Sequence, residues 1–274
     1  MIRDITIGQY YPAKSVIHRL DPRVKIVCTL LFIVSLFIQN SVLGYAIATV
    51  FLAVVIRLSK VPFKFIVKGL KAVVILLLFT AVMNLFLTQG GNVLFGFWIF
   101  KISEKGLRLA VFMAIRLIYL ILGSSIMTFT TTPNGLTDGI ESLLGPLKKL
   151  KVPVHEVAMM MSIALRFIPI LLEETDKIMK AQIARGADLE SGNLIQKVKA
   201  MVPILVPLFV SAFRRANDLA MAMEARCYHG GEGRTKMKPL VYRSQDYKAY
   251  AFVIIYMVLI FVCGRMIPFH IWIF

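Results

Sequence analysis

Five long apolar runs constrain the fold of this chain more than any other feature. They are Ile26–Ile38, Val42–Ile56, Ala72–Leu87, Leu109–Met127 and Ala249–Val262. A soluble domain is only about half apolar, whereas 58% of these 274 residues are hydrophobic and the excess lies in the runs. A membrane-spanning helix needs roughly 20 mostly apolar residues. We therefore expect an all-α integral membrane protein with about five transmembrane helices, some short enough to need flanking Lys and Arg side chains or local thinning of the bilayer.

The basic residues indicate which segments face the cytoplasm. The net charge is +17, and five basic residues precede the first run, five lie in the loop expected at 57–71 and seventeen lie in 130–248. The turn at 39–41 has none and the loop at 88–106 has two. The positive-inside rule places the first three of these segments in the cytoplasm. We interpret the charge as topology and attraction to anionic lipid rather than as a nucleic-acid-binding surface.

The chain is expected to have three parts. Residues 1–129 form four transmembrane helices with a cytoplasmic N-terminus, 130–248 form a cytoplasmic and mostly helical segment, and 249–274 form the last transmembrane helix and an external tail. In the external loop, glycines and asparagine before an aromatic run favour a short β-hairpin. Arg116 is costly inside a span, so we expect it to contact polar neighbours such as Asn84; a role with substrate or ion is the alternative.

Local signals predict several helix ends. Ser103 followed by Glu104 is typical of the start of the fourth helix, and Thr132-Pro133 predicts an N-cap and first residue of another. Two long helices follow, at about 154–184 and 194–226, each about 30 residues or roughly 45 Å long. Each is apolar in one half and charged in the other. We therefore expect them to begin at the membrane and extend into the cytoplasm.

Both long helices end in the same short pattern. The first closes with Ala184-Arg185-Gly186 and the second with Ala225-Arg226-Cys227. A cation is mildly favourable at a helix C-terminus, which is explanation enough for one such arginine. Two matching motifs, 41 residues apart, instead favour a paired docking site. Small flanking residues let a partner approach, and the guanidinium can then bind carboxylates in a bidentate manner.

Two other classes of protein fit the sequence less well. An intramembrane enzyme needs catalytic groups, but His155-Glu156 does not continue into a zinc-binding HExxH motif, and no phosphate-binding loop occurs. The four histidines are scattered along the chain and form no metal cluster. A permease with its own substrate path needs polar residues on several spans, and Asn84 with Arg116 is too few. We therefore expect no catalytic, cofactor or metal site in this chain.

The ordered set of motifs resembles the transmembrane T component of energy-coupling factor (ECF) transporters, the EcfT family. The resemblance covers nearly the whole chain and is carried by Ile17–Arg23, Leu136–Glu141, Val152–Met161, Ala164–Pro169 and the two Arg motifs. It implies a multi-pass protein of a prokaryotic plasma membrane, with long coupling helices that cross in an X. It also implies that Arg185 and Arg226 dock two ABC-type ATPases, which are identical or different.

The same resemblance implies a second kind of partner. An interchangeable membrane S component, which binds a vitamin or other micronutrient, would be held by the coupling helices and the membrane part. ATP binding and hydrolysis on the ATPases would move the coupling helices and reorient the S component. This chain would then be a non-catalytic subunit, and its sequence does not name the transported substrate.

Overall fold

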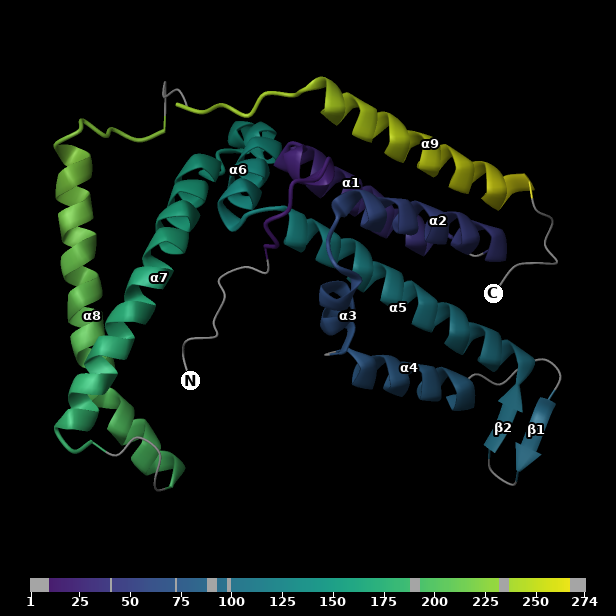
Figure 1. Cartoon of the computed structure of the whole chain (residues 1–274), viewed down its shortest axis with the longest axis horizontal. Helices are drawn as coiled ribbons and strands as arrows, with labels where there is room; N and C mark the ends of the chain where they lie inside the picture. The colour runs from purple at the N-terminus through teal and green to yellow at the C-terminus, as the bar shows by residue number, and fades with distance from the viewer. Residues whose placement is uncertain are drawn as a thin grey trace. The chain divides into compact units, whose positions relative to one another are not determined.

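The described residues form two compact units. The computed structural model describes residues 10–39, 41–71, 73–87, 93–97, 100–187, 193–231 and 237–266. One unit, here called the bundle, comprises Gly8–Ser142 and Leu240–Phe274. The other, here called the helix-pair unit, contains Leu143–Pro239. The described chain is almost entirely helical, with one small two-stranded sheet (Figure 1).

Four apolar helices form the centre of the bundle. They are α1 (Pro22–Ile38), α2 (Val42–Ser59), α5 (Glu104–Thr130) and α9 (Ser244–Met266). The bundle also contains a short 3₁₀ helix η1 (Ile17–Arg19), α3 (Phe63–Lys71), α4 (Val74–Leu87), β1 (Val93–Phe97), β2 (Phe100–Ser103) and α6 (Pro133–Leu143). Helix α5 contacts α1 to α4, and α9 contacts α1 and α2. The core between them includes buried Leu36, Ala48, Leu52, Ile126 and Tyr256.

The number of candidate spans agrees with the prediction, but their identity differs in part. By length and composition, four described helical segments can cross a membrane, 42–59, 106–130, 154–184 and 244–265. A fifth span arises if α3 and α4, bent by 60°, count as one. Helix α1 has 17 residues and is not among the four. The segment 154–184 is among them although the sequence assigns it to the cytoplasm, because its charged residues are concentrated in its second half.

The segment 57–71 is predicted to be a loop, and this prediction is wrong for most of its length. Helix α2 continues to Ser59, and α3 occupies Phe63–Lys71. Ile66 in α3 is fully buried while Lys64 and Lys71 are exposed. An amphipathic helix with a basic polar face is stable along a membrane surface. The charge that indicates a cytoplasmic side therefore does not require an unstructured connection.

The predicted helix starts are confirmed. The Ser103 hydroxyl accepts from the Gly106 amide at 3.0 Å at the start of α5. The Thr132 hydroxyl accepts from the Gly135 amide at 3.2 Å at the start of α6. Such N-caps satisfy amide groups that have no partner within the helix.

The strands β1 and β2 between α4 and α5 pair antiparallel, with Phe97 opposite Phe100.

Polar contacts tie the segment before α1 to the end of α5. The Tyr11 amide donates to the Phe129 carbonyl at 2.9 Å, and Lys25 Nζ donates to the Thr130 carbonyl at 2.7 Å. His18 Nε2 donates to the Tyr11 carbonyl at 2.9 Å, since a carbonyl oxygen can only accept. Burial lowers the pKa of His18, which favours this neutral ring. These contacts hold the stretch from Tyr11 to His18 against the bundle.

A buried carboxylate joins the starts of α1 and α9. Asp21 caps α1 by accepting from the Arg23 amide at 2.9 Å, and Pro22 occupies the first helical position. Asp246 in α9 is 1% exposed. It accepts from the amides of Asp21 at 2.8 Å and Arg243 at 2.7 Å. The link joins residues 225 positions apart and holds two helix starts at the same end of the bundle.

Arg116 lies inside α5 and has polar partners on other helices. It is 9% exposed, and it donates from Nε to the Tyr45 hydroxyl at 3.0 Å and from a terminal nitrogen to the Gln39 carbonyl at 3.2 Å. The Asn84 amide, which we expect as a partner, donates to the Thr80 carbonyl in its own helix at 2.9 Å. The packing interpretation of Arg116 thus holds with α1 and α2 as its neighbours.

We expect Tyr45→Phe to destabilise the bundle by about 0.6 kcal/mol, the average for polar contacts between membrane helices, and by at most about 1.7 kcal/mol. The change removes a partner of a buried cation and leaves the ring in place. The measurement is the melting temperature in detergent, which should fall by about 2–4 °C for each kcal/mol. Tyr119→Phe is the control, because the Tyr119 hydroxyl pairs with Thr49 in an exposed contact at 2.5 Å. Equal melting temperatures for the two variants would contradict the prediction.

Candidate functional site

The first Arg motif ends α7 (Val154–Ala184) in a Schellman motif. Gly186 is left-handed, with φ at 89°. Its amide donates to the Ile183 carbonyl at 2.9 Å, and the Ala187 amide donates to the Gln182 carbonyl at 3.0 Å. This pair of bonds is the signature of the motif. Arg185 is therefore the last residue before the left-handed turn, and the turn fixes its backbone at the end of the helix.

The second Arg motif ends α8 (Leu194–Glu224) in the same way. Cys227 is left-handed, with φ at 56°. Its amide donates to the Glu224 carbonyl at 2.8 Å, and the Tyr228 amide donates to the Met223 carbonyl at 3.1 Å. These bonds match those of α7 position by position, so Arg226 corresponds to Arg185. The sequence indicates the likeness of the two motifs, and the structure shows that both form the same turn. Its left-handed position suits Gly186, whereas Cys227 adopts it against the preference of an L-residue.

The six residues of the two motifs are available to a partner. Ala184, Arg185, Gly186, Ala225, Arg226 and Cys227 are all exposed. Within the described part of the chain, neither guanidinium has a recorded ion pair or side-chain hydrogen bond. Each follows the carbonyl-rich, electronegative end of a 31-residue helix. The arrangement suits recognition of a carboxylate by a planar, bidentate donor.

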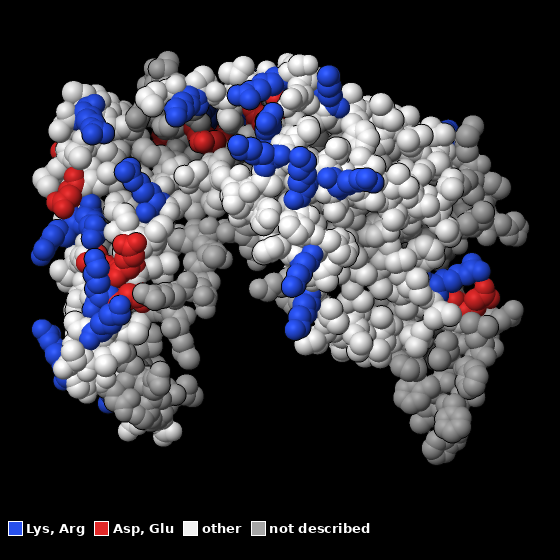
Figure 2. Space-filling view, in the orientation of Figure 1, with Lys and Arg blue, Asp and Glu red and all other residues white. Residues whose placement is uncertain are grey.

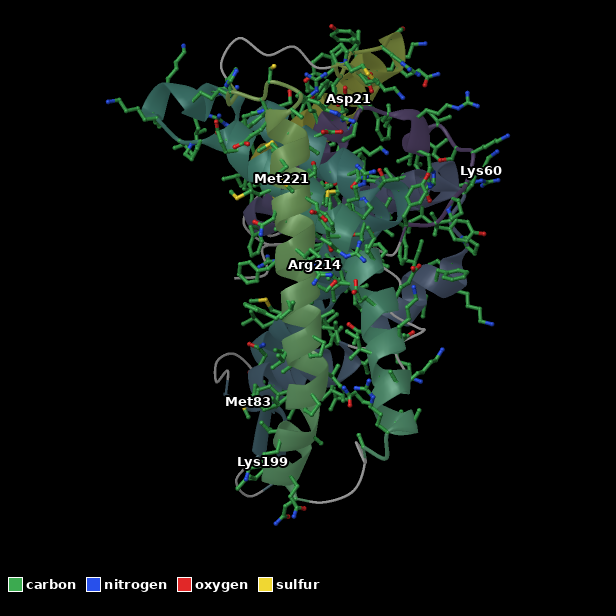
Figure 3. The ribbon with its side chains drawn as sticks, turned by 90° about the vertical axis from the view of Figure 1, so that its left-hand side faces the viewer. Asp21, Lys60, Met83, Lys199, Arg214 and Met221 are labelled. Atoms are coloured by element: carbon green, nitrogen blue, oxygen red, sulfur yellow. The ribbon has the colours of Figure 1, made fainter. Side chains whose placement is uncertain are left out.

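Helices α7 and α8 run antiparallel and cross. Glu174 near the end of α7 accepts from Ser211 at 2.5 Å and from Arg215 at 2.8 Å. The Gln182 amide donates to the Pro203 carbonyl at 3.2 Å. Figure 1 shows the two helices crossing, and Figure 3 looks onto α8, with Lys199 near one end and Met221 toward the other.

The antiparallel arrangement puts the two arginines far apart. Arg185 follows the end of α7, close to where Gln182 contacts Pro203 of α8, whereas Arg226 follows the end of α8. Gln182 contacts Pro203, so the part of α8 from Pro203 to Glu224, roughly 30 Å of helix, separates the two motifs. The two exposed arginines therefore lie at separate places on the helix pair.

Sequence reasoning does not identify the contacts that hold the helix pair together. One is the Glu174–Arg215 ion pair. In the sequence its two residues cannot be told apart from the many other charged residues of the two helices. Gly231 is another: a Cβ there would lie 2.5 Å from Cδ2 of His155, at the start of α7. The glycine after the second Arg motif thus lets the chain pack on His155. Only the pairing of the helices reveals either contact.

We expect Cys227→Gly to stabilise the end of α8. A left-handed conformation costs an L-residue about 1–2 kcal/mol, whereas glycine adopts it freely. One kcal/mol corresponds to about fivefold in an opening equilibrium. Hydrogen–deuterium exchange should therefore slow about fivefold for the amides of 226–228. Cys227→Ala is the control that removes the thiol but keeps the Cβ, and it should leave exchange unchanged. Equal exchange rates for the glycine and alanine variants would refute the expectation.

No described residues form a group of three or more His, Cys, Asp or Glu placed to hold a metal ion. The candidate site is the pair of exposed, arginine-bearing helix ends.

Comparison with known proteins identifies the family. A family model described as "CbiQ: Cobalt transport protein" matches residues 13–237. The chain is 62% identical over 250 residues to the energy-coupling factor transporter transmembrane protein EcfT of Clostridium kluyveri, covering 91% of this chain and 93% of that one. It is 51% identical over 261 residues to the EcfT of Bacillus subtilis, covering 95% and 98%. The chain therefore belongs to the CbiQ/EcfT family of transport proteins.

Proposed function

We propose that this chain is the transmembrane T component of an ECF-type importer for vitamins or other micronutrients. It would link ATP hydrolysis on two ABC-type ATPases to reorientation of a membrane S component. The observation that carries the proposal is the pair of matching helix ends, each presenting one exposed arginine. The names of the relatives support it, since each is called an energy-coupling factor transporter transmembrane protein.

The ATPase contacts are assigned to the two Arg motifs. A partner groove with a carboxylate would receive the Arg185 side chain, and a second would receive Arg226. The left-handed turn after each arginine keeps the following chain from covering it. Because roughly 30 Å of α8 separates the two motifs, each would engage a separate ATPase subunit. The two subunits are identical or different in this proposal.

An apolar stripe on α8 is assigned to the S component. The stripe consists of Val198, Val202, Leu205, Val206, Phe209 and Phe213, which are between 49% and 66% exposed. Their spacing places them on one face of the helix, away from Ser211 and Arg215, which contact α7. A large exposed apolar surface marks a protein or membrane contact. A small hydrophobic membrane subunit is both a protein and a part of the membrane, so it fits this surface.

The coupling role follows from the helix pair. Helices α7 and α8 are the proposed coupling helices: each ends in an ATPase-docking arginine, and α8 also carries the stripe. Motion of the ATPases against the helix ends would be transmitted through rigid helix to the S component. The Glu174–Arg215 contact where the helices meet would keep the two moving together.

Copurification tests the proposal as a whole. The chain would be purified in mild detergent from its native membrane, and everything that accompanies it would be identified by mass spectrometry. ATPase subunits and small hydrophobic proteins are the expected partners. A chain that purifies alone and shows hydrolytic activity of its own would overturn the assignment, including the non-catalytic role.

The proposed orientation has residues 1–129 as the first membrane part, 130–248 in the cytoplasm and 249–274 as the last span with an external tail. In Figure 2, basic side chains of the bundle gather where α1 and α9 begin, and the start of α5 at the other end has the Arg108–Glu104 pair. That polarity is what the positive-inside rule expects of a plasma-membrane protein with its N-terminus inside. The β1–β2 hairpin is then external.

Cysteine labelling of intact cells tests this orientation. In a background without the native cysteines, Gly91→Cys and Phe274→Cys should react with an impermeant maleimide, and Gly192→Cys and Lys238→Cys, at an exposed position, should not. The Gly192→Cys result also decides whether α7 crosses the membrane, since a crossing would place that residue outside. Labelling at Gly192→Cys would refute the cytoplasmic assignment of 130–248.

A further inference from the structure

The bundle contains an apolar cavity that the proposed function does not use. It has a volume of about 290 Å³ and lies among η1, α1, α2, α5 and α9. Its apolar walls include Leu20, Val24, Val55, Ile126, Phe252 and Val253. Protein interiors are close-packed, with few voids larger than a water molecule. A void of this size is near the lower limit for ligand pockets.

All walls of the cavity come from one end of the bundle. They are the first half of α1, the second half of α2, the last turns of α5 and the first half of α9. This is the end where basic residues gather (Figure 2), and where Asp246 joins the starts of α1 and α9. In the proposed orientation it lies in the cytoplasmic leaflet. The cavity is therefore at the depth of acyl chains that hang from anionic headgroups.

The polar groups at the cavity have cationic character. Lys25 and Lys248 both line it, together with Gln245. Lys25 Nζ is held by the carbonyls of Thr130 and His18 at 2.7 and 3.3 Å, so its charge is fixed in place. Lys248 is exposed, with no recorded side-chain partner in the described chain.

The nearby acids bind other groups, and among the described residues none forms an ion pair with Lys248. Asp21 pairs with Arg23 at 2.9 Å. Asp246 accepts from two backbone amides. A cation beside an apolar cavity in the inner leaflet is complementary to a phospholipid with a negative headgroup.

We propose that this cavity holds one acyl chain of an anionic phospholipid of the cytoplasmic leaflet, with Lys248 paired to the headgroup phosphate. The acyl chain would fill an apolar volume that water does not enter. The floor is closed by Phe32 packed on Gly123, where a Cβ would lie 2.6 Å from Phe32 Cε1. The leaflet follows from the orientation proposed above, whereas the lipid site itself does not depend on the ATPase or S-component assignments.

Photo-crosslinking of the purified complex in liposomes tests the site. The probes are phosphatidylglycerol and phosphatidylcholine carrying the same diazirine on one acyl chain. A Lys near the surface of an anionic membrane contributes about 1 kcal/mol, or about fivefold in occupancy. We expect phosphatidylglycerol adducts on Cys28, Thr29 or Phe252, about fivefold more abundant than those of phosphatidylcholine. Lys248→Gln should make the two lipids equal.

A filling variant and its matched control separate the cavity from ordinary boundary lipid. Ala249 lines the cavity, so Ala249→Phe should abolish these adducts. Ala53→Phe adds the same ring at an exposed position of α2 that does not line it, and should leave them unchanged. Equal labelling by both lipids in the wild type, or adducts that survive Ala249→Phe, would overturn the proposal. So would adducts seen on the isolated chain but lost in the complex, since a partner segment would then fill the cavity.

Discussion

Replacing Arg185 and Arg226 together by alanine is expected to strip the ATPases from the complex. Truncating one member of a buried, hydrogen-bonded charge pair typically costs about 2–5 kcal/mol, much of it from the partner charge left unpaired. That is roughly 30- to several-thousand-fold in affinity at each site. Two docking points on one scaffold reinforce each other, because the second docking event is effectively intramolecular. Either single variant is therefore expected to assemble but couple poorly, and the double variant to lose its ATPases.

The measurements are copurification of the ATPases and ATP-dependent uptake. Lysine at both positions should restore assembly only in part, since it lacks the planar fork of arginine. Arg214→Ala is the matched control, because Arg214 is an exposed arginine in the middle of α8 (Figure 3) and in neither motif. The variants should insert normally, because both motif arginines lie beyond the helix ends. A double alanine variant that keeps its ATPases in wild-type proportion would refute the docking role.

Replacing Phe209 by aspartate is expected to release the S component while the ATPases stay bound. Phe209 is 66% exposed on the stripe and packs against Phe213, with ring centroids 4.9 Å apart. A carboxylate buried without a partner in an apolar contact costs several kcal/mol, so affinity should fall at least about 100-fold. The measurement is copurification of both partners. This outcome is the reverse of that expected for the double arginine variant, so the two surfaces can be tested separately.

Phe209→Leu is the control for the stripe. It keeps an apolar side chain of similar exposure and should retain most S-component binding. The same aspartate placed at Arg214, off the stripe, should have little effect on that binding. If Phe209→Asp retains the S component, the stripe is not its contact. Loss of both partners at once would instead indicate that α8 no longer folds.

Local signals in the sequence predict the helix ends well. The range of α7 agrees with the prediction at both ends, and α8 ends within two residues of it. In the Ser103 and Thr132 caps, each hydroxyl accepts from an amide three residues later in the sequence. These features depend on residues one to four positions apart, so the chain determines them without reference to the fold. The two Arg motifs belong to the same class, because each Schellman turn is closed within six residues.

The count of basic residues predicts less of the structure than the local helix-end signals do. It indicates the basic segments, but it does not separate a loop from an amphipathic helix, and α3 fills most of the predicted loop at 57–71. Nor does it fix which helices span: α7 meets the length and hydropathy of a span although its charges favour the cytoplasm. A rule on net charge contains no term for helical periodicity or for where along a helix the charges lie.

What the sequence by itself determined is the membrane class, the helix ends and the two arginine-bearing turns, all set by composition or by near neighbours. Only the tertiary structure decided that Arg116 donates to Tyr45, that Asp246 binds the Asp21 amide 225 residues away, and that α7 and α8 run antiparallel with their arginines at opposite ends. The cavity beside Lys248 is likewise visible only in the tertiary structure. Each depends on which helix faces which, and apolar side chains that attract without direction leave that choice to the packing of the whole chain.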